Sequence, residues 1–127
     1  MPKKGKNKIL IIEDDTYISD MYKLKLESEG FDVKVVPDGQ KGLEQLMREK
    51  PDLVLLDVVM PKMDGFSVLQ NIKEDPEVQD VPVVLLTNLG QKDSVEKGIR
   101  LGALDYIIKA HFTPFEVVEK VKEILNR

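Results

Sequence analysis

The chain contains no cysteine, and it has one histidine among its 127 residues. Disulfides, thiolate metal sites and cysteine nucleophiles are therefore excluded. The lone His111 has no His or Cys companion that could complete a metal site, and we expect it to be an ordinary loop residue. No apolar stretch reaches membrane-spanning length and no signal-peptide pattern opens the chain, so we expect a cytoplasmic protein with no membrane partner.

The chain also lacks a strong excess of one charge, because its net charge is −4 and its acidic and basic residues are interspersed. A dedicated nucleic-acid binder would need a basic face, so we expect no direct DNA binding. The exception is the lysine-rich start, MPKKGKNK, which we interpret as a solvated tail over residues 1–7. The length suits one domain, which we place at residues 8–127.

Short apolar segments alternate along the chain with longer segments of helical spacing. The short ones are rich in Val, Ile and Leu, which predicts strands at 8–12, 32–36, 52–56, 81–86 and 104–108. Apolar residues recur at intervals of three and four in 16–29, 39–49, 65–74, 91–101 and 113–126, which predicts helices. Thr113, Pro114 and Glu116 mark the start of the last helix as a capping box. Such alternation predicts an α/β domain with a parallel sheet and helices on both faces.

One predicted strand ends in an unexpected residue. In LVLLDVVMP (53–61), four apolar residues run directly into Asp57, although an isolated carboxylate would be costly inside an apolar strand. Binding sites of open parallel sheets lie beyond the carboxyl ends of the strands. The polar residues that follow the predicted strands are Glu13, Asp14, Asp15, Asp57, Thr87, Asn88 and Lys109.

Each of these residues also has a simpler interpretation. Asp15 would cap the first helix, Thr87 would be an ordinary β-branched strand residue, and Lys109 would be solvated. Asp57 alone could close a strand. Their shared position at one edge of the sheet favours a common site over independent placement.

The residue types in this group indicate a particular chemistry. Oxygen ligands without His or Cys favour a hard cation, and Mg²⁺ accepts one or two carboxylates together with waters and phosphate oxygens. A lysine and a hydroxyl beside the metal can neutralise and bind a phosphoryl group. The combination predicts phosphoryl transfer to Asp57, with Lys109 and Thr87 assisting.

With these residues in place, the chain resembles the receiver domain of two-component response regulators, in particular stand-alone receivers of the chemotaxis type. The matching stretches are ILIIEDD (9–15), LVLLDVVMPKMDGF (53–66), VPVVLLTN (81–88) and GALDYIIK (102–109). The resemblance implies a doubly wound, flavodoxin-like (βα)5 fold with five parallel strands in the order 2-1-3-4-5.

The resemblance also implies roles for individual residues. Asp57 would be the phosphoacceptor. The Mg²⁺ ligands would be Asp14 and Asp57 directly, Glu13 mainly through water, and the backbone carbonyl of Val59.

Three further residues receive roles in the same way. Thr87 would be the switch hydroxyl and Lys109 the partner of the acyl phosphate. Tyr106 would be the aromatic residue whose inward or outward orientation follows phosphorylation, although without the family it would be interpreted as a half-buried strand aromatic. Gly65 would relieve backbone crowding in the turn after Asp57.

As function, the resemblance implies a phosphorelay switch rather than an enzyme, apart from self-catalysed phosphorylation and dephosphorylation of Asp57. The donor would be a sensor histidine kinase or a phosphotransfer protein. Phosphorylation would change the face built from residues 88–112 for an unknown downstream protein target. Because the sequence starts at Met1, we expect a protein that works alone rather than an excised domain.

Two residues depart from the family pattern. Ala110 stands where a proline usually follows the lysine in a cis peptide, so we expect either a trans bond with a rearranged loop or a strained cis bond. Asn88 stands where the family usually has a small residue, and its amide could bind the phosphoryl group or restrict water, so we expect altered autodephosphorylation.

Two other classes of protein fit the sequence less well. A haloacid-dehalogenase-like phosphatase would need a second Asp at the position of Val59, and the length leaves no room for a cap domain. A flavodoxin-type carrier would need a phosphate loop rich in glycine and hydroxyls after the first strand, where EDDTYIS is acidic.

Overall fold

The structure, a computed structural model, describes residues 7–126. Its strands are β1 (Lys8–Ile12), β2 (Asp32–Val36), β3 (Leu53–Leu56), β4 (Val83–Thr87) and β5 (Asp105–Ile108). Its α-helices are α1 (Thr16–Ser28), α2 (Gly39–Arg48), α3 (Gly65–Glu74), α4 (Lys92–Arg100) and α5 (Pro114–Leu125), and a 3₁₀ helix (Lys109–His111) precedes α5. All but the last residue of the predicted basic tail lie outside the described residues. Within residues 7–126, no helix is long and apolar enough to span a membrane.

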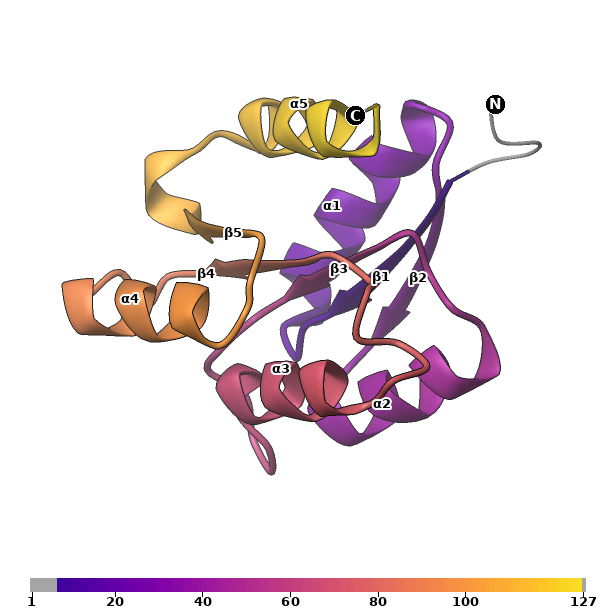
Figure 1. Ribbon diagram of the computed structural model, residues 1–127. Helices are drawn as coiled ribbons and strands as arrows, with labels where there is room; N and C mark the ends of the chain where they lie inside the picture. Colours follow the sequence, from indigo (N-terminus) through magenta and orange to yellow (C-terminus); the bar gives the residue numbers. More distant parts are fainter. Residues whose placement is uncertain (1–6, 127) are drawn as a thin grey trace.

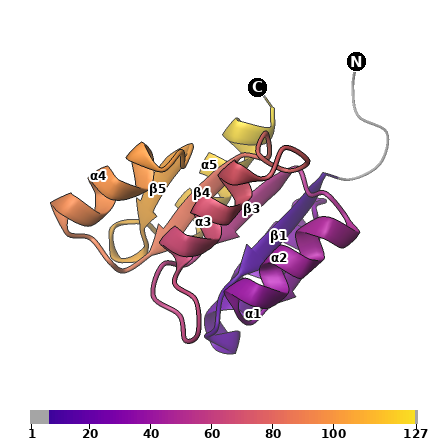
Figure 2. The same cartoon turned by 60° about the horizontal axis from the view of Figure 1, so that its bottom comes forward.

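The five strands form one parallel sheet in the order β2-β1-β3-β4-β5, which confirms the predicted fold. Helices α1 and α5 cover one face, and α2, α3 and α4 lie on the other, as Figure 1 and the turned view in Figure 2 show. Every predicted strand and helix is present, and no end differs from its prediction by more than two residues. The strand predicted at 81–86 runs instead from Val83 to Thr87, because Pro82 has no N–H to donate and Thr87 pairs with Ile108.

The core has two layers, because side chains alternate across each strand. In β1, Leu10 and Ile12 pack among residues of α2 and α3, whereas Ile9 and Ile11 pack among residues of α1 and α5. β3 and β4 are buried at every position, as expected for strands covered on both faces.

Two predicted helix starts are confirmed. The Asp15 side chain accepts hydrogen bonds from the backbone N–H groups of Tyr17 and Ile18 and so caps α1. Thr113 and Glu116 form the predicted reciprocal capping box of α5, with Pro114 in its first turn. Both caps fix helices that begin beside the polar edge of the sheet.

Candidate functional site

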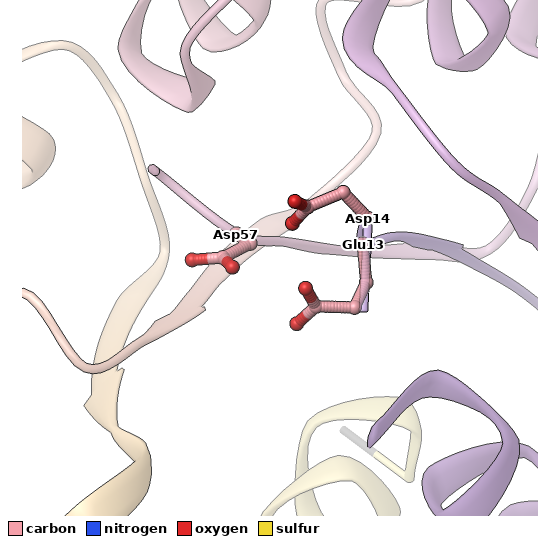
Figure 3. A group of neighbouring side chains, drawn as sticks. All are labelled: Glu13, Asp14 and Asp57. Carbon is pink, nitrogen blue, oxygen red and sulfur yellow. The ribbon is translucent and has the colours of Figure 1, made fainter. Parts of the chain in front are cut away.

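Three carboxylates meet where β1 and β3 end. In the parallel register Ile12 lies beside Leu56, so Glu13 and Asp57 follow on neighbouring strands, and the Asp57 N–H donates to the Ile12 carbonyl at 3.0 Å. Each of Glu13, Asp14 and Asp57 offers an oxygen within 4.8 Å of the others. Figure 3 shows the three side chains turned toward a common space. The proximity of these three side chains, which the sequence predicted, is thus present in the structure.

This carboxylate group fits a hard divalent cation. Its donors are all oxygens, as Mg²⁺ prefers, and they come from two strand ends whose register is set by the sheet. The Glu13 and Asp57 side chains are largely buried, whereas Asp14 is exposed. Crowded carboxylates repel unless a cation lies between them, so the arrangement favours binding of a cation.

Asp57 is tolerated at the end of an apolar strand because its side chain has polar partners. Asp57 is 8% exposed, and its Oδ1 accepts a hydrogen bond from the Val58 N–H at 2.7 Å. Its Oδ2 lies 3.5 Å from the Nζ of Lys109. The remaining lone pairs of the carboxylate face an open cleft of about 450 Å³.

Lys109 reaches the site from the end of β5. Its Nζ lies 2.5 Å from Glu13 Oε1 as well as 3.5 Å from Asp57 Oδ2. The Lys109–Ala110 peptide bond is trans, which is the first of the two expected alternatives, and the chain continues in the 3₁₀ helix Lys109–His111. The replacement of proline by Ala110 therefore leaves the lysine turned toward Asp57.

Burial and the neighbouring charges shift the pKa values of Glu13 and Lys109. Burial raises the pKa of Glu13 to about 7, against the opposing effect of the Lys109 ammonium, and the nearby Asp57 charge adds to the rise. For Lys109, burial lowers the pKa, but the hydrogen bond to Glu13 and the charge of Asp57 outweigh it, so the net pKa is raised. Lys109 therefore stays cationic at neutral pH.

Thr87 and Tyr106 are joined through the backbone of Leu89. The Thr87 hydroxyl, which is buried, accepts a hydrogen bond from the Leu89 N–H at 3.3 Å. The Tyr106 hydroxyl donates to the Leu89 carbonyl. The ring of Tyr106 is half-buried against the core while its hydroxyl is bound to Leu89, and we call this the inward position of the ring. Sequence reasoning missed Leu89, because a residue that acts through its backbone leaves no signal in its side chain.

The loop between β3 and α3 completes the cleft. A β-carbon at Gly65 would lie 2.1 Å from the Asp57 carbonyl oxygen, so only glycine fits beside the acceptor strand. Val59 is 64% exposed and lines the cleft, together with Asn88 from the end of β4. The cleft also contains two apolar residues that the sequence did not single out, Ile18 and Leu89.

The chain is similar to known proteins along most of its length. Residues 9–122 match the family described as the response regulator receiver domain. The chain is 42% identical over 123 residues to the DNA-binding dual master transcriptional regulator RpaA of Synechocystis sp., covering 94% of this chain and 49% of that protein. It is 38% identical over 120 residues to the alkaline phosphatase synthesis transcriptional regulatory protein PhoP of Bacillus subtilis, covering 94% and 49%. The chain thus spans about half the length of these relatives.

The structure is also similar to solved structures. A putative response regulator from Chloroflexus aurantiacus superposes with a TM-score of 0.88 at 32% identity, covering 96% of this chain and 99% of that one. A receiver domain protein described as CheY-like, from Methanospirillum hungatei, superposes with a TM-score of 0.88 at 30% identity, covering 96% and 95%. The resemblance drawn from the sequence motifs is confirmed.

One prediction is corrected by these relatives. We expected no direct DNA binding, but RpaA is named a DNA-binding regulator and PhoP a transcriptional regulatory protein. The expectation was wrong because it rested on the net charge of this chain, −4, and the charge of a receiver segment carries no information about a DNA-binding segment in a protein twice as long.

Proposed function

The chain belongs to the response regulator receiver domain family, and we propose that it works as a switch in which Asp57 receives a phosphoryl group from a phosphohistidine. The observation that carries the assignment of Asp57 is its position between a carboxylate pair and a lysine. Asp57 lies within 4.8 Å of Glu13 and Asp14 and 3.5 Å from the Lys109 ammonium. It is also the carboxylate of this group that directly follows β3, the central strand of the sheet.

In the proposed step, an oxygen of the Asp57 carboxylate attacks phosphorus and the P–N bond to the donor imidazole breaks. The imidazole nitrogen leaves with the bonding electron pair and takes up a proton. Lys109 lies close enough to Asp57 to neutralise the charge on the transferred group. The Thr87 hydroxyl lines the cleft from the end of the neighbouring strand β4, and it would donate to a phosphoryl oxygen.

Glu13, Asp14 and Asp57, with the backbone carbonyl of Val59, would hold Mg²⁺, as their oxygen-only chemistry favours. The ion would supply further positive charge to the transferring phosphoryl group. Glu13 would also have a second role, because it accepts a hydrogen bond from the Lys109 ammonium and so holds that lysine at the cleft.

We assign phosphorylation and dephosphorylation of Asp57 to the same residues, without a separate enzyme active site. The cleft over Asp57 is open, at about 450 Å³, so a small phosphodonor or a water molecule can enter it. Asn88 is exposed on the wall of the cleft, where its amide would meet an entering group. Its amide would bind or exclude that water, which is how this residue would alter the lifetime of the acyl phosphate.

A protein donor is proposed to dock beside the cleft on α1. The outward side of this helix carries Tyr17, which is 85% exposed, and Leu24, which is 69% exposed, around a hollow of about 520 Å³. Met21 lines this hollow and also a second one that includes Asn88 and Lys109. The apolar surface is thus continuous with the acceptor site, as a donor that must reach Asp57 requires.

The output is proposed to be control of transcription, as the names of the relatives suggest. Phosphorylation would draw the Thr87 hydroxyl toward the new group and so alter its bond to Leu89, whose carbonyl accepts Tyr106. The face formed by residues 88–112 contains both the loop of Leu89 and helix α4. That face would then present a changed surface to the rest of a longer protein or to a partner.

The test is incorporation of labelled phosphate from acetyl phosphate in the presence of Mg²⁺. We expect one phosphate per chain, lost in Asp57→Asn and retained in Asp93→Asn, which changes an exposed carboxylate in the first turn of α4. Removing Mg²⁺ with EDTA should abolish labelling. Labelling that persists in Asp57→Asn would remove Asp57 from the mechanism.

A further inference from the structure

Helix α4 is held to the fold more weakly than the other helices. Side chains cap α1, α2, α3 and α5, through Asp15, Asp38, Asp64 and Thr113 respectively. The cap residue of α4, Gln91, makes no such side-chain hydrogen bond. Only one residue of α4 is buried, and that residue is Gly98. The helix therefore depends on few contacts for its position on the sheet.

Gly98 is the point where α4 meets Tyr106. A β-carbon built on Gly98 would lie 2.9 Å and 3.1 Å from two carbons of the Tyr106 ring, and 2.6 Å from Leu85 Cδ1. The Leu85 contact is with the end of a flexible but fully buried side chain, whereas the Tyr106 contacts are with the edge of the ring. A side chain at position 98 would therefore force the Tyr106 ring, the Leu85 side chain or α4 itself to shift by some tenths of an ångström.

The same ring is fixed at its other end. The Tyr106 hydroxyl donates to the Leu89 carbonyl, and the Leu89 N–H donates to Thr87 Oγ1. A ring displaced by a side chain at position 98 would strain the hydrogen bond from its hydroxyl to Leu89 unless α4 moves away. Glycine inside a helix is less favourable than alanine, so Gly98 weakens a helix that already lacks a side-chain cap.

We propose that Gly98 sets the balance between the inward and outward positions of the Tyr106 ring, and is therefore a positioning residue of the switch. The inference rests on the proposed function, because the ring matters as the readout of phosphorylation at Asp57. Gly98 acts by leaving space for the inward ring. Because α4 packs against Tyr106 and Leu85 at this residue, a side chain at position 98 would contact the ring directly. A side chain at this position would favour the outward ring irrespective of phosphorylation.

The first test follows the ring directly by ¹⁹F NMR of protein labelled with 3-fluorotyrosine. The chain has three tyrosines, so each signal can be assigned by a Tyr→Phe variant. In metal-free, unphosphorylated Gly98→Ala, we expect the ratio of inward to outward ring to fall about tenfold, with greater line broadening by a paramagnetic solute. The matched control is Ser94→Ala, which also raises helix propensity within α4. An unchanged Tyr106 signal in Gly98→Ala, or an equal shift in Ser94→Ala, would overturn the proposal.

The second test is a double-mutant cycle with Tyr106→Ala, read by urea unfolding. Gly98→Ala should lower the midpoint in the presence of the ring, and should leave it unchanged or raise it when the ring is absent. This arm also decides the case in which Gly98→Ala alone fails to fold, because removing the ring should then restore folding. Failure of that rescue contradicts the proposal.

Neither test needs phosphate, so they can fail independently of the proposed function. Labelling of Asp57 from acetyl phosphate is measured on the same variants, and Gly98→Ala should remain labelled because residue 98 does not line the acceptor cleft. If wild type is not labelled, the proposed function fails. If labelling is normal and the Tyr106 ring is indifferent to residue 98, only the inference about Gly98 fails.

Discussion

The Lys109 ammonium lies 2.5 Å from Glu13 Oε1, although the two residues are 96 positions apart in the chain. The pair joins the end of β5 to the end of β1, and its ammonium also lies 3.5 Å from Oδ2 of Asp57, which follows β3 between them. The lysine side chain is 11% exposed and that of Glu13 is 5% exposed. Glu13 thus positions Lys109 as well as contributing to the carboxylate group.

Replacing Lys109 tests this arrangement. Lys109→Gln removes the only cation that the described residues place beside both Glu13 and Asp57. We expect phosphorylation from acetyl phosphate to slow by about 100-fold or more, since a lost charge-stabilising donor in a buried site has effects of this size. The control is Lys122→Gln, an exposed lysine paired with Glu29. Equal rates in Lys109→Gln and wild type would assign the lysine a structural role only.

The raised pKa of Glu13 predicts a pH dependence for the metal-free protein. The folded carboxyl has a pKa of about 7, above its ordinary value of 4.5, so the folded state holds this proton more tightly than the unfolded state does. The stabilising effect is full below pH 4.5 and is lost as the pH rises to about 7. As the pH rises from 5 to 8, we expect the loss of the Glu13 proton to lower the free energy of unfolding by about 1–3 kcal/mol.

The measurement is urea unfolding in EDTA across that range, for wild type and Glu13→Gln. The neutral amide should flatten the pH dependence relative to wild type, and Mg²⁺ should restore stability to wild type at pH 8 because a cation offsets the carboxylate charge. Parallel curves for the two proteins would show that Glu13 does not titrate in this window.

Gly65 provides a test of how the acceptor strand is supported. A methyl group there would lie 2.1 Å from the Asp57 carbonyl oxygen and 2.7 Å from the Val58 Cα, and backbone atoms cannot turn away as a side chain can. We expect Gly65→Ala to reduce the free energy of unfolding by about 3 kcal/mol, at the upper end of overpacking costs. Gly30→Ala is the comparison, because a β-carbon there meets nothing within 4 Å and only its φ of +96° is unfavourable. A Gly65→Ala protein as stable as wild type in urea would contradict the packing shown here.

How far the sequence predicted this site depends on which signal each residue carries. Periodicity and the alternation of segments predicted the sheet and its covered faces, and from these the convergence of Glu13, Asp57 and Lys109 followed. The trans bond before Ala110 was left open, since side-chain identity does not determine how a loop rearranges. The link between Thr87 and Tyr106 was beyond prediction because it passes through backbone atoms of Leu89. The prediction about DNA binding was wrong because it was drawn from the net charge of a chain that spans about half the length of its relatives.

The apolar side of α1 gives the last prediction, which separates docking from chemistry. Leu24 is 69% exposed and lines the hollow on α1, away from the Asp57 cleft. We expect Leu24→Glu to reduce phosphotransfer from a phosphohistidine protein by about tenfold or more, because a charge replaces apolar contact area, and to leave labelling by acetyl phosphate unchanged. Met47→Glu is the matched control, since Met47 is 51% exposed on α2, on the opposite face of the sheet. Equal loss with both phosphodonors would mean that Leu24 acts through the fold, and equal loss in both variants would place the docking surface elsewhere.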